Sequence, residues 1–277
     1  MAQPERVPVA SYTDPASLEG RGFVVLGAGQ GIGRQTCHAL ARAGARVLCV
    51  DRDAELANAV AGEVQGVACV ADVSVRADVN RVFADAAGRF GDTLGGLVDI
   101  VGMADIRSIP DTDDASWSRN FDLNVRHAYL AIQIGARAMA KGGSMVFVSS
   151  ISGTHSIANE VSYGAAKAAL NHLVRGAAHE LGPRNIRVNA VTPGFVRTPR
   201  LLAALSEDFW IDLKSYIPLR RAAEPSDVAK AILFLACDMS SYVTGAIIPI
   251  DGGLSTAAPV PHIPFAPGMQ TRVAARS

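Results

Sequence analysis

The chain has 277 residues, of which 49% are hydrophobic, so it is long enough to bury a large core as one or two domains. Its 26 Lys and Arg residues balance its 26 Asp and Glu residues, and a net charge of zero gives no indication of a nucleic-acid or membrane-surface partner. The composition therefore favours a protein that acts on a small molecule.

Short β-branched runs alternate along the chain with longer Ala-rich stretches of helical character. The runs are almost continuously apolar, as in a parallel sheet that is covered by helices on both faces. This alternation predicts a doubly wound α/β fold, a single Rossmann-type domain with a parallel seven-stranded sheet. Strands are expected at residues 22–27, 46–51, 66–72, 96–102, 144–150, 186–193 and 246–253. Helices are expected at about residues 31–44, 53–63, 75–90, 114–140, 161–182 and 225–237.

Three segments lie outside this alternation. Residues 1–20 are predicted to be an N-terminal extension of a catalytic domain at 21–255. Residues 195–220, rich in Leu, Phe, Trp and Tyr, are too long for a simple connection, and we interpret them as a substrate lid. Residues 256–277, rich in Pro and Ala without a helical or strand period, are predicted to be a frayed tail or an arm on a neighbouring surface.

The sequence shows no targeting, membrane or metal signature. It lacks the basic and apolar regions of a secretory signal, and no run of about 18 apolar residues predicts a transmembrane helix, so we expect a cytoplasmic protein. The cysteines lie in apolar runs without metal-ligand spacing and are expected to be buried, a metal site or disulfide framework being the minority interpretation. They are Cys37, Cys49, Cys69 and Cys237.

The first expected strand runs directly into the glycine-rich stretch GAGQGIG, residues 27–33, which opens a helix. Glycines allow a tight turn and let backbone N–H groups approach a pyrophosphate, and the helix N-terminus adds a positive dipole end. At the start of a βαβ unit, this context predicts a dinucleotide site rather than a turn without a ligand.

Asp51 ends the second expected strand, 18 residues after Gly33. A carboxylate there can accept hydrogen bonds from both adenosine ribose hydroxyls and would repel a 2′-phosphate. Two unit charges about 4 Å apart interact by roughly 4 kcal/mol at an effective dielectric constant near 20, enough to choose between cofactors. Gln30 in the turn is not basic, although Arg52 could swing toward a phosphate. NAD is therefore favoured over NADP. Asp53 is better placed than Asp51 to cap the next helix.

Asp72 ends the third expected strand and has two equally supported interpretations. Its side chain either receives the adenine edge, with Val73 offering a backbone N–H, or it is a turn residue.

Tyr163 and Lys167 lie four residues apart on an expected helix and would share one face. Alone, this spacing occurs by chance in many amphipathic helices, with the lysine reaching toward water. However, Ser149 and Ser150 lie at the carboxyl end of the fifth expected strand, where open α/β sheets bind ligands, and Asn124 places a polar amide inside a long helix. Four polar side chains, those of Asn124, Ser150, Tyr163 and Lys167, therefore point to one crevice.

With these residues, the chain resembles the short-chain dehydrogenase/reductase family over about residues 20–255. A serine 13 residues before a Tyr-x-x-x-Lys pair is the most specific part of the resemblance. The matching motifs are GAGQGIG, the DV at 72–73, Asn124, Ser150, YGAAK at 163–167, NAVTPG at 189–194 with Thr198, and IPIDGG near the end.

The resemblance implies roles for these residues. Tyr163 would be the general acid/base, and Lys167 would bind the nicotinamide ribose and lower the pKa of the phenol, by one to three units from a free value near 10. Ser150 would hold the substrate oxygen, and Asn124 would keep a water that links Lys167 to solvent. Further cofactor contacts are implied for Gly27, Gln30, Gly31, Ile32, Gly33, Asp51, Arg52, Asp72, Val73, Gly102, Pro193, Val196 and Thr198.

One departure from the family concerns the segment after the fourth strand. The family usually has Asn-Asn-Ala-Gly there, whereas this chain reads VGMA at 101–104. This difference puts local cofactor contacts in doubt, but not the proton and hydride chemistry.

The substrate pocket is expected to be lined by Ser150, Ser152, His155, Tyr163 and Phe195, although a surface-loop position is equally expected for His155. The lid's apolar residues suggest an apolar secondary alcohol, alicyclic, aromatic or steroid-like, but they could equally form a helix that packs on a neighbouring subunit. These residues are Leu201, Leu202, Leu205, Phe209 and Trp210.

Three functions are weighed. The favoured one is an NAD-dependent dehydrogenase of a secondary alcohol. The alternatives are an NADPH-dependent carbonyl or 3-oxoacyl thioester reductase, and a non-catalytic dinucleotide-binding module, against which the complete polar set argues. The resemblance also implies a homotetramer.

Overall fold

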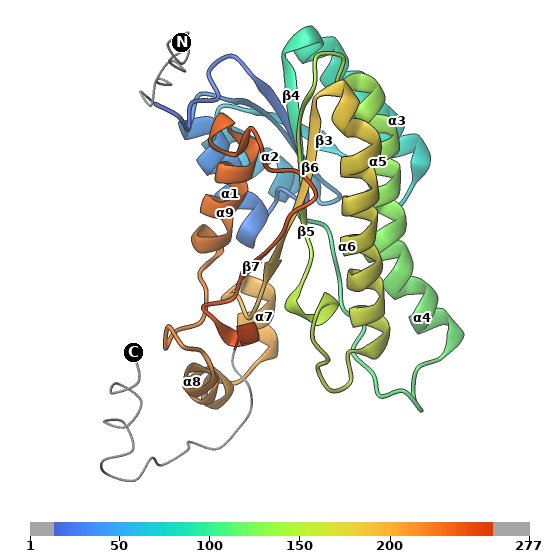
Figure 1. Ribbon diagram of the computed structural model, residues 1–277, viewed down its shortest axis with the longest axis vertical. Helices are drawn as coiled ribbons and strands as arrows, with labels where there is room; N and C mark the ends of the chain where they lie inside the picture. The colour runs from blue at the N-terminus through green and yellow to red at the C-terminus, as the bar shows by residue number, and fades with distance from the viewer. Residues whose placement is uncertain (1–13, 257–277) are drawn as a thin grey trace, which may run out of the picture.

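A parallel sheet with the strand order β3-β2-β1-β4-β5-β6-β7 forms the centre of the molecule. The computed structural model describes residues 14–256. Helices cover both faces of the sheet, as Figure 1 shows, and this arrangement confirms the predicted Rossmann fold. Most of the predicted N-terminal extension, and the predicted tail from residue 257 on, lie outside the described residues.

The strands occur where the apolar runs predicted them, but several end earlier. The fourth expected strand, 96–102, begins two residues sooner and ends at Asp99, because the chain turns away there along the cavity described below. The strands are β1 (Gly22–Leu26), β2 (Arg46–Asp51), β3 (Val67–Val70), β4 (Leu94–Asp99), β5 (Gly143–Val148), β6 (Ile186–Pro193) and β7 (Ile247–Ile250). Since β1 pairs with both β2 and β4, the order reverses beside β1, and a crevice is expected at the carboxyl ends of these strands.

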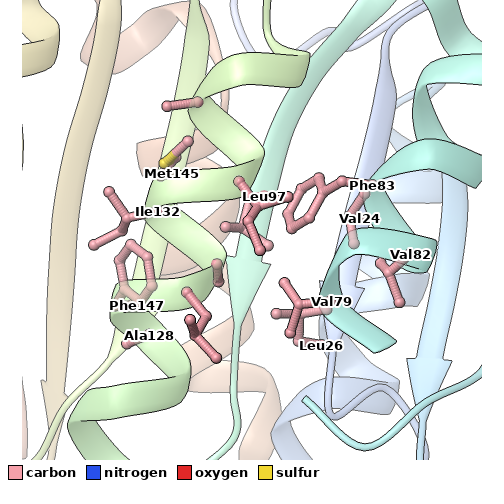
Figure 2. Packing of buried hydrophobic residues seen from close by; sticks show 14 of the residues in the cluster. Val24, Leu26, Val79, Val82, Phe83, Leu97, Ala128, Ile132, Met145 and Phe147 are labelled. Carbon is pink, nitrogen blue, oxygen red and sulfur yellow. The ribbon is translucent and has the colours of Figure 1, made fainter. Parts of the chain in front are cut away.

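Two hydrophobic cores flank the sheet. On one face, alternate residues of β1, β4 and β5 pack against α3 and α5, and Figure 2 shows Val24, Leu97 and Phe147 facing Val79 and Ile132. The intervening residues of the same strands pack against α1 and α9 on the other face. Burial on both faces explains why the strands read as continuous apolar runs.

The helices agree with the predicted positions within a few residues, apart from one interruption and two additions. They are α1 (Gly31–Arg42), α2 (Ala54–Glu63), α3 (Arg76–Phe90), α4 (Asp114–Phe121), α5 (His127–Ala138), α6 (Val161–Leu181), α7 (Pro199–Ala204), α8 (Glu207–Tyr216) and α9 (Pro225–Ala236). Within residues 14–256, no helix combines the length and apolar character that a membrane span requires.

The interruption lies in the helix expected at 114–140. Helices α4 and α5 are joined by one π-helical turn, η2 (Asp122–Arg126), which contains the fully buried Asn124. Such turns widen the helix and often occur at functional sites. The sequence predicted the helix but not this turn.

The lid segment, residues 195–220, contains the two additional helices, α7 and α8. Its apolar residues mostly pack on one another, around the buried Trp210, Leu213 and Ile217. The prediction that these residues face a substrate is therefore wrong for most of them, because Leu205, Phe209 and Trp210 stabilise the lid segment itself.

Candidate active site

A cavity of about 470 Å³ lies at the carboxyl ends of the parallel strands. Its lining comes from the β1–α1 turn, the ends of β2, β4, β5 and β6, the beginning of α6 and the lid segment. Its volume falls within the range of small-molecule sites, roughly 300–1,000 Å³. One end of the cavity lies against the glycine-rich turn and the other against the lid segment.

The glycine-rich turn allows helix α1 to begin very close to strand β1. A Cβ atom on Gly33 would lie 1.9 Å from the Gly27 carbonyl oxygen, so only glycine permits this approach. Gly27 and Gly31 have φ values of +78° and +54°, which also favour glycine. Gly27, Gln30, Gly31 and Ile32 line the cavity, whereas the buried Gly33 lies behind them. The turn thus places the first residues of α1 on the cavity wall, where a pyrophosphate could approach the helix N-terminus.

The end of β2 provides the carboxylate expected beside an adenosine ribose. Asp51 lines the cavity, and its Oδ2 and Oδ1 atoms accept hydrogen bonds from Gly29 N at 2.8 Å and Asp53 N at 3.1 Å. Each carboxylate oxygen keeps a further acceptor site for a ribose hydroxyl. Asp53 caps α2 through bonds from two backbone N–H groups, as predicted. Arg52, exposed, lines the same part of the cavity.

At the end of β3, Asp72 forms a turn, which is one of its two predicted roles. Its Oδ1 atom accepts hydrogen bonds from the backbone N–H of Ser74 at 2.9 Å and from the Ser74 hydroxyl at 2.6 Å. Asp72 and Val73 also line the cavity. The contact with an adenine edge stays a prediction.

Asn124 and Lys167 lie together behind Gly102. Lys167 Nζ donates to Val148 O at 2.9 Å, and Asn124 Nδ2 donates to Met103 O at 2.8 Å. A Cβ atom on Gly102 would lie 2.9 Å from Lys167 Nζ and 3.0 Å from Asn124 Oδ1, an atom that is buried without a hydrogen-bond partner. The VGMA segment therefore lines the cavity and is held by Asn124, while Asn124 itself is not part of the lining.

Tyr163 and Ser150 line the cavity in front of Lys167. The ammonium nitrogen of Lys167 lies 5.8 Å from the centroid of the Tyr163 ring, so the two side chains share one face of α6, as the spacing predicted. Burial raises the pKa of Tyr163 to about 12, and the Ser150 hydroxyl opposes this effect only in part. The expected lowering of this pKa is therefore wrong, because the effect of burial is larger than the opposing effects of the neighbouring groups.

Lys167 is itself strongly affected by its surroundings. Burial lowers its pKa to about 8, and the nearby Asp99 carboxylate acts in the opposite direction. The cavity wall thus holds a lysine whose charge is sensitive to what lies beside it.

Asp99 and His127 form a buried acid–imidazole pair that the sequence analysis missed. They are 2% and 1% exposed, and His127 Nε2 lies 3.1 Å from Asp99 Oδ2. Asp99 also accepts a bond from Val101 N at 3.0 Å, and His127 lines the cavity. An aspartate inside the apolar run GLVDIV was the signal that could have identified this pair.

At the other end of the cavity, a chain of hydrogen bonds leads away from Ser150. The Ser150 hydroxyl donates to Ser152 Oγ at 3.1 Å, and the Ser152 hydroxyl donates to Glu160 Oε2 at 2.6 Å. Glu160 lines the cavity and was missed because a carboxylate in a loop reads as a solvated residue. Its position between Ser150 and Tyr163 was the available signal.

The remaining predicted residues divide between the cavity and the surface. Phe195, Pro193, Val196 and Thr198 line the cavity, and Thr198 also caps α7 through a bond from Leu201 N. His155 is exposed, bonded to the Thr154 hydroxyl, and absent from the lining. Of the two interpretations of His155, its exposed side chain favours the surface-loop position. In the part of the chain that the structure describes, no cluster of His, Cys, Asp and Glu is arranged to hold a metal ion.

Comparison with known proteins relates this chain to a large set of enzymes. A family model described as enoyl-(acyl carrier protein) reductase matches residues 27–255. Galactitol 2-dehydrogenase (L-tagatose-forming) of Cereibacter sphaeroides is 37% identical over 260 residues, which cover 87% of this chain and 98% of that protein. The 3-oxoacyl-(acyl-carrier-protein) reductase of Thermotoga maritima is 35% identical, with 86% and 98% of the two chains covered.

A solved structure has a similar fold over most of the chain. It is a 7α-hydroxysteroid dehydrogenase in complex with NADH and 7-oxo glycochenodeoxycholic acid, and it is 32% identical with a TM-score of 0.83. The similarity covers 87% of this chain and 96% of that chain.

Proposed function

Since the chain belongs to the short-chain dehydrogenase/reductase family of oxidoreductases, which act on alcohol groups, we propose that it is an NAD-dependent dehydrogenase of secondary alcohols. The observation that carries the proposal is the position of Ser150, Tyr163 and Lys167 on the wall of a cavity that begins at a glycine-rich turn. NAD, when bound there, supplies the hydride acceptor.

The chain's own residues position the substrate and move its proton. Tyr163 exchanges a proton with the substrate oxygen as general acid/base, and Ser150 holds that oxygen by a hydrogen bond. Lys167 binds the nicotinamide ribose and contributes positive charge behind the phenol, while Asn124 keeps its unpartnered Oδ1 for a water beside Lys167. Asn124, Ser150, Tyr163 and Lys167 together are the proposed catalytic set.

The glycine-rich turn and Asp51 support NAD as the cofactor. The close approach at Gly33 and the position of Gly102 in the cavity lining fit a dinucleotide that lies along the strand ends. Asp51 has acceptor sites for the ribose hydroxyls, and its charge opposes a 2′-phosphate. The other proposed contacts are those of Gln30, Gly31, Ile32, Arg52, Asp72, Val73, Pro193, Val196 and Thr198.

A second candidate is an NADPH-dependent reductase of carbonyl groups or 3-oxoacyl thioesters. Its support is Arg52, which lines the cavity next to Asp51, together with the similarity to the reductase of Thermotoga maritima. Titration of the protein with NADH and with NADPH separates the two candidates. A preference for NADPH of about tenfold or more, which is 1.4 kcal/mol, contradicts the proposal.

The catalytic proposal is tested by a panel of secondary alcohols, with NADH formation followed by absorbance. Tyr163→Phe is expected to lower turnover by about a thousandfold, because general acid/base catalysis typically contributes 10²–10⁴-fold. NADH affinity should remain within about twofold, since the hydroxyl alone is removed. Tyr242→Phe, on a fully exposed tyrosine, is the control and should behave as the wild type. Turnover of Tyr163→Phe at the wild-type rate would reject the assigned role.

We further propose that the substrate is largely apolar and that the enzyme is a cytoplasmic homotetramer. Ile157, Phe195 and Leu201 on the cavity wall support an alicyclic, aromatic or steroid-like skeleton. The family resemblance supports the tetramer, which sedimentation at micromolar concentration tests. A monomer under those conditions would contradict it.

A further inference from the structure

The end of the cavity next to the lid segment, which is the proposed substrate end, carries two opposite charges that the proposed chemistry does not use. Glu160 and Arg200 both line the cavity near Tyr163, and they shift the pKa of Tyr163 in opposite directions. Neither side chain takes part in an ion pair with any residue between 14 and 256. Both are therefore available to a molecule in the cavity.

Glu160 is held toward the cavity by the serine pair. It stands at the N-cap position of α6, but its side chain does not cap the helix. Instead, Oε2 accepts the short bond from the buried Ser152, whose hydroxyl in turn accepts the bond from Ser150. The carboxylate therefore lies two hydrogen bonds from the serine that holds the reacting oxygen, and its second oxygen has no partner among the described residues.

The two charges restrict the group that this end of the cavity accepts. A substrate ammonium group would be attracted by Glu160 but repelled by Arg200, and a substrate carboxylate would meet the reverse arrangement. A neutral hydroxyl avoids both repulsions, because it carries no charge and can still donate a hydrogen bond to the Glu160 carboxylate. The apolar side chains of Ile157, Phe195 and Leu201 form the neighbouring wall and suit the carbon face of a ring.

The geometry points to an alicyclic vicinal diol as the substrate, with one hydroxyl between Ser150 and Tyr163 and the neighbouring hydroxyl on Glu160. This inference rests on the proposed function and narrows its substrate class. In the reaction, the carbon that bears the first hydroxyl gives a hydride to NAD⁺, and the proton of that hydroxyl passes to Tyr163. The products are an α-hydroxy ketone, NADH and a proton, and the second hydroxyl is unchanged.

The test compares cyclohexane-1,2-diol, as cis and trans isomers, with cyclohexanol. The wild type should oxidise the better diol isomer with a kcat/KM about tenfold or more above that of cyclohexanol, because a hydrogen bond to a charged group is among the stronger ones. Glu160→Ala should bring this ratio close to one, and Glu160→Gln should keep part of it. Glu180→Ala, on the exposed end of the same helix, is the matched control and should leave the ratio unchanged.

Binding provides a readout that does not depend on turnover. Calorimetric titration of the diol into the NADH-saturated protein should show about tenfold weaker binding for Glu160→Ala than for the wild type, while the NADH affinity of the two proteins stays equal. Equal NADH affinity also shows that the variant is folded.

Several results would overturn the inference. One is a wild-type kcat/KM for the diol that is close to that for cyclohexanol. Another is a Glu160→Ala variant whose kcat/KM falls equally for the diol and for cyclohexanol. The third is a kcat/KM about tenfold higher for 2-aminocyclohexanol or 2-hydroxycyclohexanecarboxylate than for the diol. In each case other secondary alcohols are still oxidised, so the proposed function stands. Failure of every secondary alcohol of the panel with both cofactors would instead contradict the proposed function itself.

Discussion

The two ends of the cavity are built from different parts of the chain. At the proposed cofactor end, the glycine-rich turn and the end of β2 form the wall, and glycines fix the shape of the turn. At the substrate end, side chains from the loop before α6 and from the lid segment form the wall. A backbone wall suits a cofactor of constant shape, whereas a wall of loop side chains can differ between relatives that share the fold.

Lys167 lies where the two ends meet. It contacts the end of β5 through Val148 O, lies beside Gly102 toward the cofactor end and shares a helix face with Tyr163 toward the substrate end. A substitution in the glycine-rich turn or in the lid segment should therefore affect one end of the cavity, whereas a substitution of Lys167 should affect both.

The largest effect is expected at the cofactor end. Gly33→Ala would place a Cβ atom 1.9 Å from the Gly27 carbonyl oxygen, and since both groups are backbone or backbone-attached, neither can rotate away. NADH binding should fall below detection in a fluorescence titration. Gly88→Ala, in a helix position with open space around it, is the control. If Gly33→Ala binds NADH as tightly as the control, the backbone wall does not hold the cofactor.

At the substrate end, the corresponding change is Trp210→Ala in the lid segment. Trp210 is 1% exposed and is the largest side chain of its cluster, so its loss should destabilise the lid segment by about 3 kcal/mol or more. KM for alcohols should rise while NADH affinity stays constant. Ile211→Ala, on the neighbouring and exposed residue, should change neither value. An equal loss of NADH affinity in Trp210→Ala would show that the two ends are not separable.

The burial of Lys167, which lies where the two ends of the cavity meet, should make the stability of the protein depend on pH. The pKa of Lys167 is about 8 in the folded protein and 10.5 in free lysine, so the unfolded chain binds more protons between these values. The wild-type unfolding free energy should therefore rise relative to Lys167→Met across this window, by about 3 kcal/mol in full, since each pKa unit contributes about 1.4 kcal/mol.

Urea denaturation from pH 7.5 to pH 10 measures this difference. Lys230→Met, at an exposed position of α9, should show no such change with pH. A constant difference between wild type and Lys167→Met over the same range would mean that the ammonium group is not destabilised by burial.

The smallest effect is expected for Asp51→Asn at the cofactor end. The amide oxygen still accepts the bond from Gly29 N, but the charge that opposes a 2′-phosphate is removed. The preference for NADH over NADPH should shrink by about tenfold, less than the full interaction of about 4 kcal/mol would give, because solvent screens the charge of this half-buried carboxylate. Asp53→Asn keeps the cap of α2 and is the control. An unchanged preference would assign cofactor choice to another residue, with Arg52 as the first candidate.

The sequence predicted the glycine-rich turn and the position of Asp51 well, because these features depend on the backbone. The glycines of GAGQGIG are required by the close approach of the backbone, and the aspartate at the strand end is favoured by its charge and acceptor atoms. The continuous apolar strands predicted the fold. The positions of Tyr163 and Lys167 also followed from helical spacing alone.

The substrate end was predicted less well because its features depend on tertiary packing. The lid's aromatic residues could not be assigned to the cavity or to the lid's own core from sequence, and the structure buries Trp210 in the latter. The serine–glutamate chain and the Asp99–His127 pair each join residues that are separate in sequence. The direction of the pKa shift of Tyr163 depends on burial, which the spacing of Tyr163 and Lys167 does not reveal.

The most direct test of the account is a pH titration of Tyr163 with and without NAD⁺. Tyrosinate absorbance is compared between the wild type and Tyr163→Phe, so that the other tyrosines cancel. Without cofactor, the phenol should stay protonated to a pH near its pKa of about 12. With NAD⁺ bound, positive charge beside the phenol favours its ionised form, so the additional wild-type signal should appear at a clearly lower pH. The same titration curve with and without NAD⁺ would contradict the claim that the two ends of the cavity act together on Tyr163.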